Sequence, residues 1–537
     1  MLEIFEIKSL WKVLDVDQTL VNRLYHEYLG IKDREIASRT ESIKLLSQVI
    51  LRIQDEMIED LKTRNTEDSI RDLYKILDEV YCFYIKQRKT RLQMQELGID
   101  LENEFIEYRN MAKNIIDSAN LWIENSLLFQ ENLKKGYNWK SSKLNQELCV
   151  KMYIYGATSQ ALSLISMSRK FGEEELFTGL KIRPNKDNAI EPIKHHPVIY
   201  YNYALIGNQK SLVSDDELEK VEDSIIGKGF NSTYKISFLN SLCLVDQFKK
   251  DIHFRSRNPI KIMDKAHFVK KIQKYSSEPI NIEDFFELFV LDKNKIKSQI
   301  KGNDGIIWIM NSNKYRHEIR PFLCLENDRI IMCYGALQQA IYLWTSLALN
   351  GGMCYSNEKD NLTSALERRN IELSNKLVEI LREKLNKHYK ADFDEIDVRY
   401  DRIFGSKKID YGDYDLIFYS NEAKELFLIE AKYFSDSLNN SGMITDYEKI
   451  FEKNGYYEHC RQRYDLVMSE PKKLKEYIGV KDKIKAHFLF VSSKPLEIEF
   501  QDEDGMVCFL CLSIFDKYIE GKIFSEEDSV VRVTHDL

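Results

Sequence analysis

The sequence predicts an α+β protein of several domains, helix-rich in its N-terminal region and with strands and helices mixed toward its C-terminus. Its 537 residues suffice for two to four domains with cores of their own. Only 21 glycines and 8 prolines are present, and such a shortage of helix-breaking residues favours long helices. Apolar runs typical of buried strands occur in residues 361–537 and in a small unit near 305–334.

Residues 1–178 are expected to form a helical bundle domain. The stretches 41–62, 68–94, 120–134 and 149–170 carry apolar residues at helical spacing, with charges between them. The first proline is Pro184, so no proline interrupts these helices. The bundle either serves as a scaffold that forms a homo-oligomer or senses a signal and binds a partner protein, and helical spacing alone does not decide between these roles.

Residues 179–360 are expected to form a mixed, mostly helical middle domain. Three prolines at 184, 192 and 197 mark its beginning, followed by a tyrosine-rich run at 198–203 whose rings are interpreted as packed core. Helices are expected at 215–226, 237–250, 261–274, 280–289 and 335–349. A small β unit is expected near 305–334, with strands at 306–310, 317–325 and 329–334.

The third domain, 361–537, begins with a strongly amphipathic helix at 362–385. Strands are expected at 393–402, 412–419 and 426–434, followed by a helix at 446–469. A fourth strand at 486–492 and a fifth at 506–513, which runs into a helix, complete the order.

Three charged residues interrupt the apolar runs 414–419 and 426–434 of the second and third strands: Asp415, Glu430 and Lys432. Side chains alternate between the two faces of a strand, so Glu430 and Lys432 point the same way. If the two strands pair as neighbours, Asp415 lies beside Glu430. A charge on so apolar a strand is costly unless it is paired or binds a metal, and this predicts a functional cluster.

Two carboxylates and a lysine at one point suit phosphodiester hydrolysis. Carboxylate oxygens are ligands for Mg²⁺ (or Mn²⁺), so Asp415 and Glu430 are the expected metal ligands. Such a metal lowers the pKa of a bound water and stabilises charge on a phosphate oxygen. Lys432 would position the attacking water.

The order Asp415-Leu-Ile-Phe followed by Glu430-Ala431-Lys432 resembles the PD-(D/E)xK nuclease superfamily. Gly412 to Ile417 is similar to that superfamily's Gly-Glu-x-Asp pattern, with Asp413 in place of the glutamate, and the proline of the name is absent. The resemblance implies a C-terminal α/β restriction-endonuclease-like domain with a central mixed sheet. It also implies a metal-dependent nuclease, expected to be a DNA endonuclease of bacterial restriction or anti-phage defence.

The resemblance implies further site residues on two helices. The first helix of the fold often supplies another acidic metal ligand, and helical phase favours Glu367 whereas the local pattern Arg369-Asn370-Ile371-Glu372 favours Glu372. On the helix after Lys432, Gln462 is expected to orient a water, and Arg461 or Arg463 to hold a phosphate. His459 on the same helix is not needed as a base, because Lys432 fills that role.

Two alternatives share this sequence evidence: an RNase or repair nuclease with the same site, and a non-enzymatic helical scaffold with an inactive nuclease fold. The net charge of −8 confines any nucleic-acid contact to a local groove. Of the nine cysteines, Cys508 and Cys511 form the only CxxC pair, so zinc is not expected. Core cysteines and the absence of a long apolar run predict a cytoplasmic protein without a membrane partner.

Overall fold

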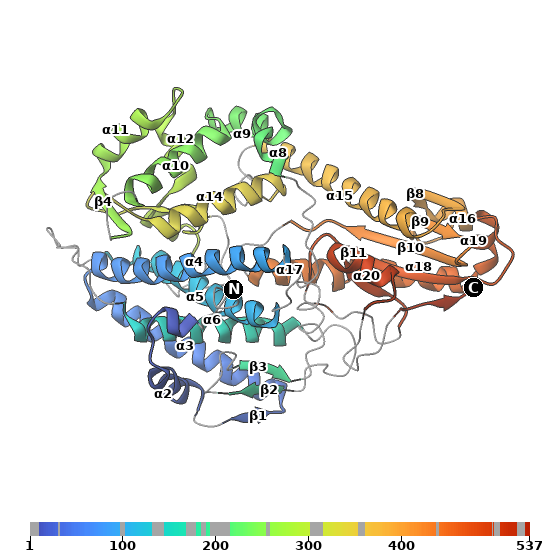
Figure 1. Cartoon of the computed structure of the whole chain (residues 1–537), viewed down its shortest axis with the longest axis horizontal. Coiled ribbons are helices and arrows are strands. Elements are labelled where there is room, and N and C mark those ends of the chain that lie inside the picture. Colours follow the sequence, from blue (N-terminus) through green and yellow to red (C-terminus); the bar gives the residue numbers. More distant parts are fainter. Residues whose placement is uncertain are drawn as a thin grey trace.

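The computed structural model describes residues 10–30, 33–96, 102–130, 144–167, 179–183, 190–193, 215–253, 258–300, 315–352, 360–435, 440–496, 498, 505–523 and 532–537. The tyrosine run at 198–203 and the expected strand at 306–310 lie outside these residues. Figure 1 shows three regions: an N-terminal helical bundle, a middle region above it, and a C-terminal sheet flanked by helices.

The N-terminal region is helical, as predicted. Its helices are α1 (Leu10–Val13), α2 (Gln18–Leu29), α3 (Arg39–Thr63), α4 (Thr66–Glu96), α5 (Glu102–Ser126) and α6 (Gln146–Met167). Side-chain caps set two of the starts: Asp17 accepts from the Thr19 amide at α2, and Ser38 from the Glu41 amide at α3. β1 (Arg34–Ile36) pairs with β2 (Gly179–Ile182), which pairs with β3 (Ile190–Ile193), so this sheet crosses the predicted boundary at 178.

The bundle and the middle region share one hydrophobic core. Buried residues of α4 such as Leu73 and Leu77 belong to the same apolar cluster as Ile331, Cys333 and Ala336 of the middle region. Residue 178 therefore does not separate two independent cores.

The middle region combines helices with a four-stranded sheet. Its elements are α8 (Asp215–Glu219), η3 (Val221–Asp223), α9 (Ile225–Tyr234), α10 (Phe238–His253), β4 (Ile260–Asp264), α11 (Lys265–Tyr275), α12 (Ile282–Phe289), β5 (Val290–Asp292), α13 (Lys293–Lys297), β6 (Phe322–Cys324), β7 (Arg329–Cys333) and α14 (Tyr334–Leu349). The strand order is β4-β7-β6-β5.

Two predictions for the middle region are wrong in detail. The expected helix at 261–274 begins only at Lys265, because residues 260–264 pair with β7. The expected strand at 317–325 is reduced to β6, because residues 316–320 form a turn in which the Arg316 carbonyl accepts from the Arg320 amide. That turn is fixed by α5: Glu124 accepts hydrogen bonds from the Arg316 side chain and the His317 amide.

The C-terminal region holds the predicted mixed sheet. Its elements are α15 (Asp360–His388), β8 (Phe393–Arg399), α16 (Tyr400–Phe404), β9 (Asp413–Ser420), β10 (Glu425–Lys432), α17 (Asn440–Phe451), α18 (Tyr456–Ser469), α19 (Pro471–Tyr477), β11 (Lys485–Ser492), β12 (Cys508–Cys511), η5 (Leu512–Ile514), α20 (Phe515–Ile519) and β13 (His535–Asp536). The strand order is β12-β11-β10-β9-β8, with β13 paired to β11. β9 is antiparallel to both its neighbours, and β11 is parallel to β10 and β12.

The single helix predicted at 446–469 is two helices. Asn454 has a φ of 63°, which ends a helical path, and α18 begins after Gly455. Because of this break, α18 does not continue the direction of α17, and it packs on the sheet through Leu466 and Val467.

Alternation along the strands gives the sheet two apolar faces. On one face, Leu416 and Ile429 pack with leucines of α15. On the other, Ile417 and Leu428 pack with α18 and α19. Asp415 and Glu430 have the same parity as Ile417 and Leu428, so they belong to the α18 face.

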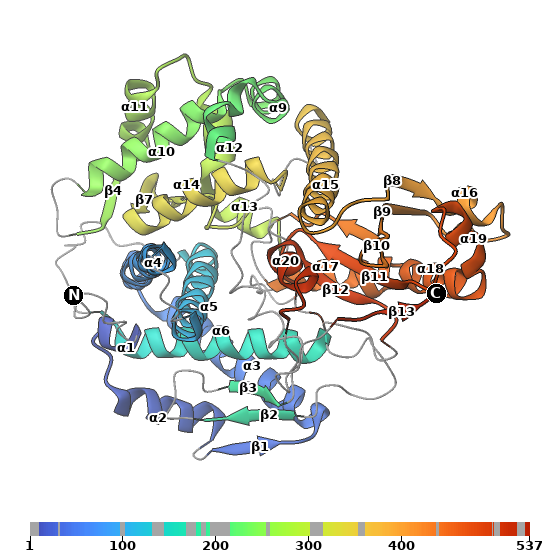
Figure 2. The same ribbon diagram turned by 45° about the vertical axis from the view of Figure 1, so that its right-hand side comes forward.

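Helix α15 spans two cores. Its first part, with Leu362, Ala365 and Leu366, belongs to the core of the middle region together with Phe230 of α9. Its second part, from Leu373 onward, covers the C-terminal sheet. Figures 1 and 2 show the helix running from α9 to the sheet. A domain boundary at 361 would therefore separate the first part of α15 from α9, on which it packs. Within the part of the chain that is described, no helix has the length and apolar character needed to cross a membrane.

Candidate functional site

The candidate site begins where β9 and β10 stop pairing through their backbones. The antiparallel register runs to Leu416 opposite Ile429. At the next position, Asp415 Oδ2 accepts from the backbone amide of Ala431 at 2.7 Å. A side-chain carboxylate thus replaces a backbone carbonyl, which fixes Asp415 beside the end of β10.

The structure brings Asp415, Glu430 and Lys432 together. The Lys432 ammonium lies 2.6 Å from Glu430 Oε1 and 3.1 Å from Asp415 Oδ2. One cation therefore bridges two carboxylates that come from adjacent strands. The geometry expected from strand alternation is present.

Arg463 of α18 is a fourth member of the cluster. It pairs with Glu430 Oε2, donates to the Asp413 carbonyl, and lies 5.5 Å from the centre of the Tyr414 ring. The cluster contains two carboxylates and two cations, so its charges balance. Either Arg461 or Arg463 is the expected phosphate ligand, but the Arg463 side chain is only 6% exposed and is paired with Glu430.

A helical wheel could have found this role of Arg463. Cys460, Arg463 and Val467 are spaced by three and four residues, and all three are buried on the inward stripe of α18. An arginine on that stripe needs a buried anion, and Glu430 is the anion that it contacts.

The four charged groups differ in access to solvent. The Asp415 and Lys432 side chains are 19% and 24% exposed, whereas the Glu430 side chain is 9% exposed. Beneath them lies a cavity of about 20 Å³, lined by Tyr414, Glu430, Arg463 and apolar residues, which has room for about one water. A phosphate would therefore meet Asp415 and Lys432 first.

Burial and charge shift the ionisation of the cluster. Burial, and secondarily Glu430, raise the pKa of Asp415 to about 6. Burial also acts on Glu430, but Arg463 and Lys432 outweigh it and hold the pKa of Glu430 below its usual value. Burial disfavours the charged form of Lys432, yet Glu430 and Asp415 raise its pKa above the usual range. The lysine is thus an ammonium ion, and Glu430 is the more firmly ionised carboxylate.

The donor set fits a hard cation that retains water ligands. Two carboxylates from adjacent strands suit Mg²⁺, which is commonly held by one or two carboxylates with waters and substrate phosphates completing its shell. Among the described residues, no group of three or more His, Cys, Asp and Glu side chains is placed to hold a metal. A closed site built entirely from such side chains, as zinc prefers, is therefore not formed by these residues.

The structure does not bring Glu367 or Glu372 to this cluster. Glu367 is exposed and lies in the part of α15 that packs on the middle region. Glu372 is exposed and pairs with Arg369 at 3.3 Å. The reason is the face of the sheet: α15 covers the face opposite to Asp415 and Glu430, so neither expected metal ligand has a path to them through this helix.

Gln462 and Arg461 lie on α18 next to Arg463 but point elsewhere. Both line a hollow of about 410 Å³ between α17 and α18, with Tyr457, Glu458 and other residues. Gln462 donates to Glu458 at 3.3 Å, and the Arg461 guanidinium lies 5.8 Å from the centre of the Tyr457 ring. Any contact of Gln462 or Arg461 with substrate would have to occur in this hollow. Among the described residues, the His459 side chain makes no contact with the Asp415 cluster.

Lys432 has an aromatic neighbour that was not predicted. Its ammonium lies 5.4 Å from the centre of the Tyr456 ring, at the start of α18. Tyr456 in turn packs near Phe434 and Phe490. The ring is a second favourable place for the lysine cation, besides the two carboxylates.

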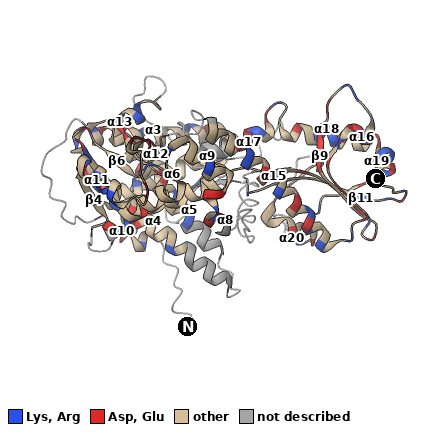
Figure 3. Ribbon diagram, turned by 90° about the horizontal axis from the view of Figure 1, so that it is seen from above, with Lys and Arg blue, Asp and Glu red and all other residues tan. Residues whose placement is uncertain are grey.

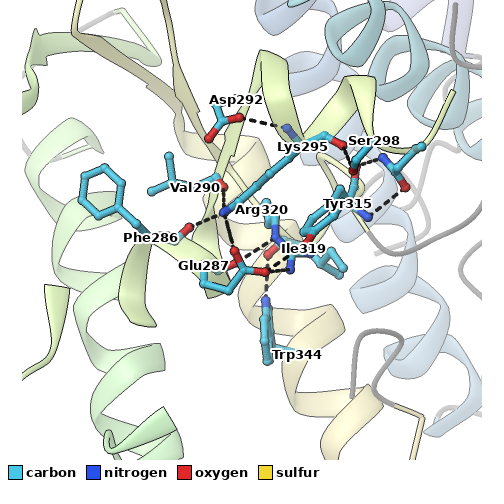
Figure 4. Close-up of polar contacts among 11 residues, drawn as sticks. Phe286, Glu287, Val290, Asp292, Lys295, Ser298, Tyr315, Ile319, Arg320 and Trp344 are labelled. Carbon is cyan, nitrogen blue, oxygen red and sulfur yellow. Dashed lines mark hydrogen bonds and ion pairs between the residues drawn. The ribbon is translucent and has the colours of Figure 1, made fainter. Parts of the chain in front are cut away.

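A different group of charges surrounds Lys295 in the middle region (Figure 4), and it has a structural explanation. The Lys295 ammonium donates to the carbonyls of Phe286 and Val290 at the end of α12 and pairs with Glu287 at 3.2 Å. Arg320 donates to the Glu287 carbonyl. These contacts satisfy the terminal carbonyls of α12.

Acidic and basic residues are intermixed over the described elements (Figure 3). The Asp415 cluster consists of four residues from β9, β10 and α18, and Asp415 and Lys432 are its more exposed members. Comparison with models of protein families, with curated proteins and with solved structures finds no match for this chain.

Proposed function

We propose that this protein is a metal-dependent nuclease that hydrolyses phosphodiester bonds. The observation that carries the proposal is the convergence of Asp415, Glu430 and Lys432 at one partly exposed end of the β9–β10 pair. The resemblance to PD-(D/E)xK nucleases, and with it a restriction-endonuclease-like C-terminal domain, belongs to the same proposal.

In this proposal Asp415 and Glu430 hold Mg²⁺ or Mn²⁺, which when bound supplies an activated water and stabilises charge on the phosphate. Arg463 keeps Glu430 ionised and fixed from below. Lys432, at the exposed rim, orients the water for attack on phosphorus. A positioned group of this kind commonly contributes ~10²–10⁴-fold in rate.

DNA is the proposed substrate, and restriction or anti-phage defence is the proposed setting. The support for both is the resemblance alone. RNA cleavage by the same site is the alternative, and an inactive scaffold is disfavoured because all three residues of the motif are present and adjacent. Nucleic acid would enter at the rim of Asp415 and Lys432, since the net charge of −8 gives no general attraction.

The test is cleavage of single- and double-stranded DNA and RNA by the full chain, with Mg²⁺, with Mn²⁺ and with a chelator. Lys432→Ala is expected to lower the rate ~10²-fold or more, for the reason given above. Lys485→Ala, an exposed lysine at the other end of the same sheet, is the matched control and should cleave as the wild type does. Cleavage by Lys432→Ala at the wild-type rate would refute the proposal that this cluster is the active site.

We also propose that the N-terminal helical region forms a homo-oligomer or binds a partner protein, because cutting both strands of a duplex commonly needs two sites. Light scattering on the full chain tests this. The intact protein is required, because α15 is shared between the middle and C-terminal cores. A monomer that recovers no partner from cells would refute the proposal.

A further inference from the structure

The Lys432 ammonium occupies the space between the two carboxylates that the proposed function assigns to a metal. Its nitrogen is 2.6 Å from Glu430 Oε1 and 3.1 Å from Asp415 Oδ2. A cation ligated by both carboxylates must lie in the same region. Two positive charges cannot share it without strong repulsion.

The other oxygen of Glu430 does not offer a way around the lysine. Arg463 pairs with Glu430 Oε2 and is anchored by the Asp413 carbonyl and by Cys460 Sγ at 3.8 Å. Arg463 and Glu430 are both almost fully buried. Oε1, the atom that Lys432 contacts, is therefore the Glu430 oxygen that faces Asp415.

We propose that Lys432 acts as an exchangeable internal counter-ion: it fills the divalent-cation position while the site is empty and must withdraw when the cation enters. Tyr456, with its ring centre 5.4 Å from the ammonium, provides a place for the displaced cation. The lysine side chain is 24% exposed, so it has room to move. The same movement takes the ammonium away from the two carboxylates, so that it can contact a water or a phosphate beside the cation.

This inference rests on the proposed function but predicts something that the function alone does not. If Lys432 only oriented a water and did not occupy the metal position, its removal would change metal affinity little, and metal binding would not change the exposure of the lysine. If it competes with the metal, its removal tightens metal binding, and metal binding exposes the lysine in the wild-type protein.

The first measurement is calorimetric titration of full-length wild type and Lys432→Met with Mn²⁺, without nucleic acid. The expected result is a Kd about tenfold or more lower for Lys432→Met, because a close like charge is removed. An unchanged or higher Kd, in a variant whose melting curve shows it folded, overturns the inference.

The second measurement uses the wild type, so it does not depend on the variant folding. Reductive methylation followed by mass spectrometry reports the reactivity of each lysine with and without Mg²⁺, with Lys485 as the exposed reference. Labelling of Lys432 relative to Lys485 is expected to rise severalfold with Mg²⁺. Unchanged or decreased labelling overturns the inference, and it also separates displacement from a general effect of charge on affinity.

The two proposals fail differently. Tighter Mn²⁺ binding and increased labelling in a protein that cleaves no nucleic acid would support the counter-ion exchange and refute the nuclease. Metal-dependent cleavage with equal Kd values would refute the exchange alone. Absence of Mn²⁺ binding in both proteins would refute the exchange together with the proposed metal.

Discussion

Gly229 of α9 lies directly against Ala365 of α15: a Cβ built on Gly229 would be 2.7 Å from the Ala365 Cβ. This is closer than two carbon atoms can approach without one of them moving. The contact fixes the first part of α15 on the middle region, while the second part of the same helix covers the C-terminal sheet.

Gly229→Ala is therefore expected to destabilise the protein by about 1–3 kcal/mol, the usual range for overpacking. In an uncrowded helix, replacing glycine by alanine stabilises the protein. The sign of the change in unfolding free energy therefore shows whether Ala365 leaves room for the added methyl group. Chemical denaturation measures it. The double variant Gly229→Ala/Ala365→Gly should recover part of the loss in a double-mutant cycle, and additive losses would show that the two residues do not oppose each other.

Asp415→Asn is expected to stabilise the metal-free protein. Burial raises the pKa of Asp415 to about 6, so the folded protein favours the protonated carboxyl group. The stability that this protonated group contributes is lost as the pH rises through about 6. Asparagine has no such charge and can still accept from the Ala431 amide. At pH 7.5 we expect a gain of about 1–3 kcal/mol, since a rise of about two pKa units at about 1.4 kcal/mol per unit sets the upper end.

Under the proposed metal assignment, Mn²⁺ should stabilise the wild type and should not stabilise Asp415→Asn, which lacks one of the two carboxylates. Thermal melts with and without Mn²⁺ measure both effects. Asp482→Asn, in an exposed pair with Lys424, is the control and should change neither quantity. A lower melting temperature for metal-free Asp415→Asn would contradict the prediction.

His317 should make stability depend on pH between about 7 and 5. Its ring is fully buried between Tyr74 and Asn120, with Nε2 2.9 Å from the Tyr74 hydroxyl and Nδ1 2.7 Å from Asn120 Oδ1. Burial, and then Arg316, lower the pKa of His317 from 6.5 to about 3. Below pH 6.5 the unfolded chain binds a proton at His317, whereas the folded chain does not. The free energy of unfolding therefore falls as the pH falls, by about 2 kcal/mol from pH 7.5 to pH 5.

His317→Gln cannot take up that proton and should lack this part of the pH dependence. Denaturation at pH 7.5 and pH 5.0 gives the difference for each protein. Glu318, whose pKa burial raises to about 7, is common to both proteins and cancels in the comparison. His267→Gln, an exposed histidine on α11, should keep the wild-type dependence; equal slopes for His317→Gln and wild type would refute the assignment.

Strand alternation predicted the central cluster because it needs only local information. Glu430 and Lys432 must lie on the same face of their strand. The short turn between the two apolar runs makes the two strands neighbours, and this places Asp415 beside Glu430 and Lys432. The placement of Glu367 failed for a physical reason. The leucine stripe of α15 is continuous on a helical wheel, but its partner changes from α9 to the sheet between Leu366 and Leu373, and a wheel does not contain that information.

Short strands were the other limit. β4 has only five residues and includes Lys261, so its pairing with β7 was hidden within a run of lysines that suits a helix surface. Arg463 was one of two arginines, with Arg461, predicted to hold a phosphate. Its role as the partner of Glu430 depends on the direction of α18, which the break at Asn454 sets.

The shared core of the bundle and the middle region also has a consequence for synthesis on the ribosome. Leu73 and Leu77 of α4 are buried with Ile331 and Ala336, which emerge from the ribosome long after α4 is complete. At roughly 5–20 residues per second, the part of the apolar surface of α4 that packs on the middle region waits on the order of ten seconds or more for its partner, although α5 follows α4 directly. During that interval Leu73, Leu77 and their apolar neighbours lack part of their final packing, so the nascent chain is expected to be open to aggregation and to chaperone binding.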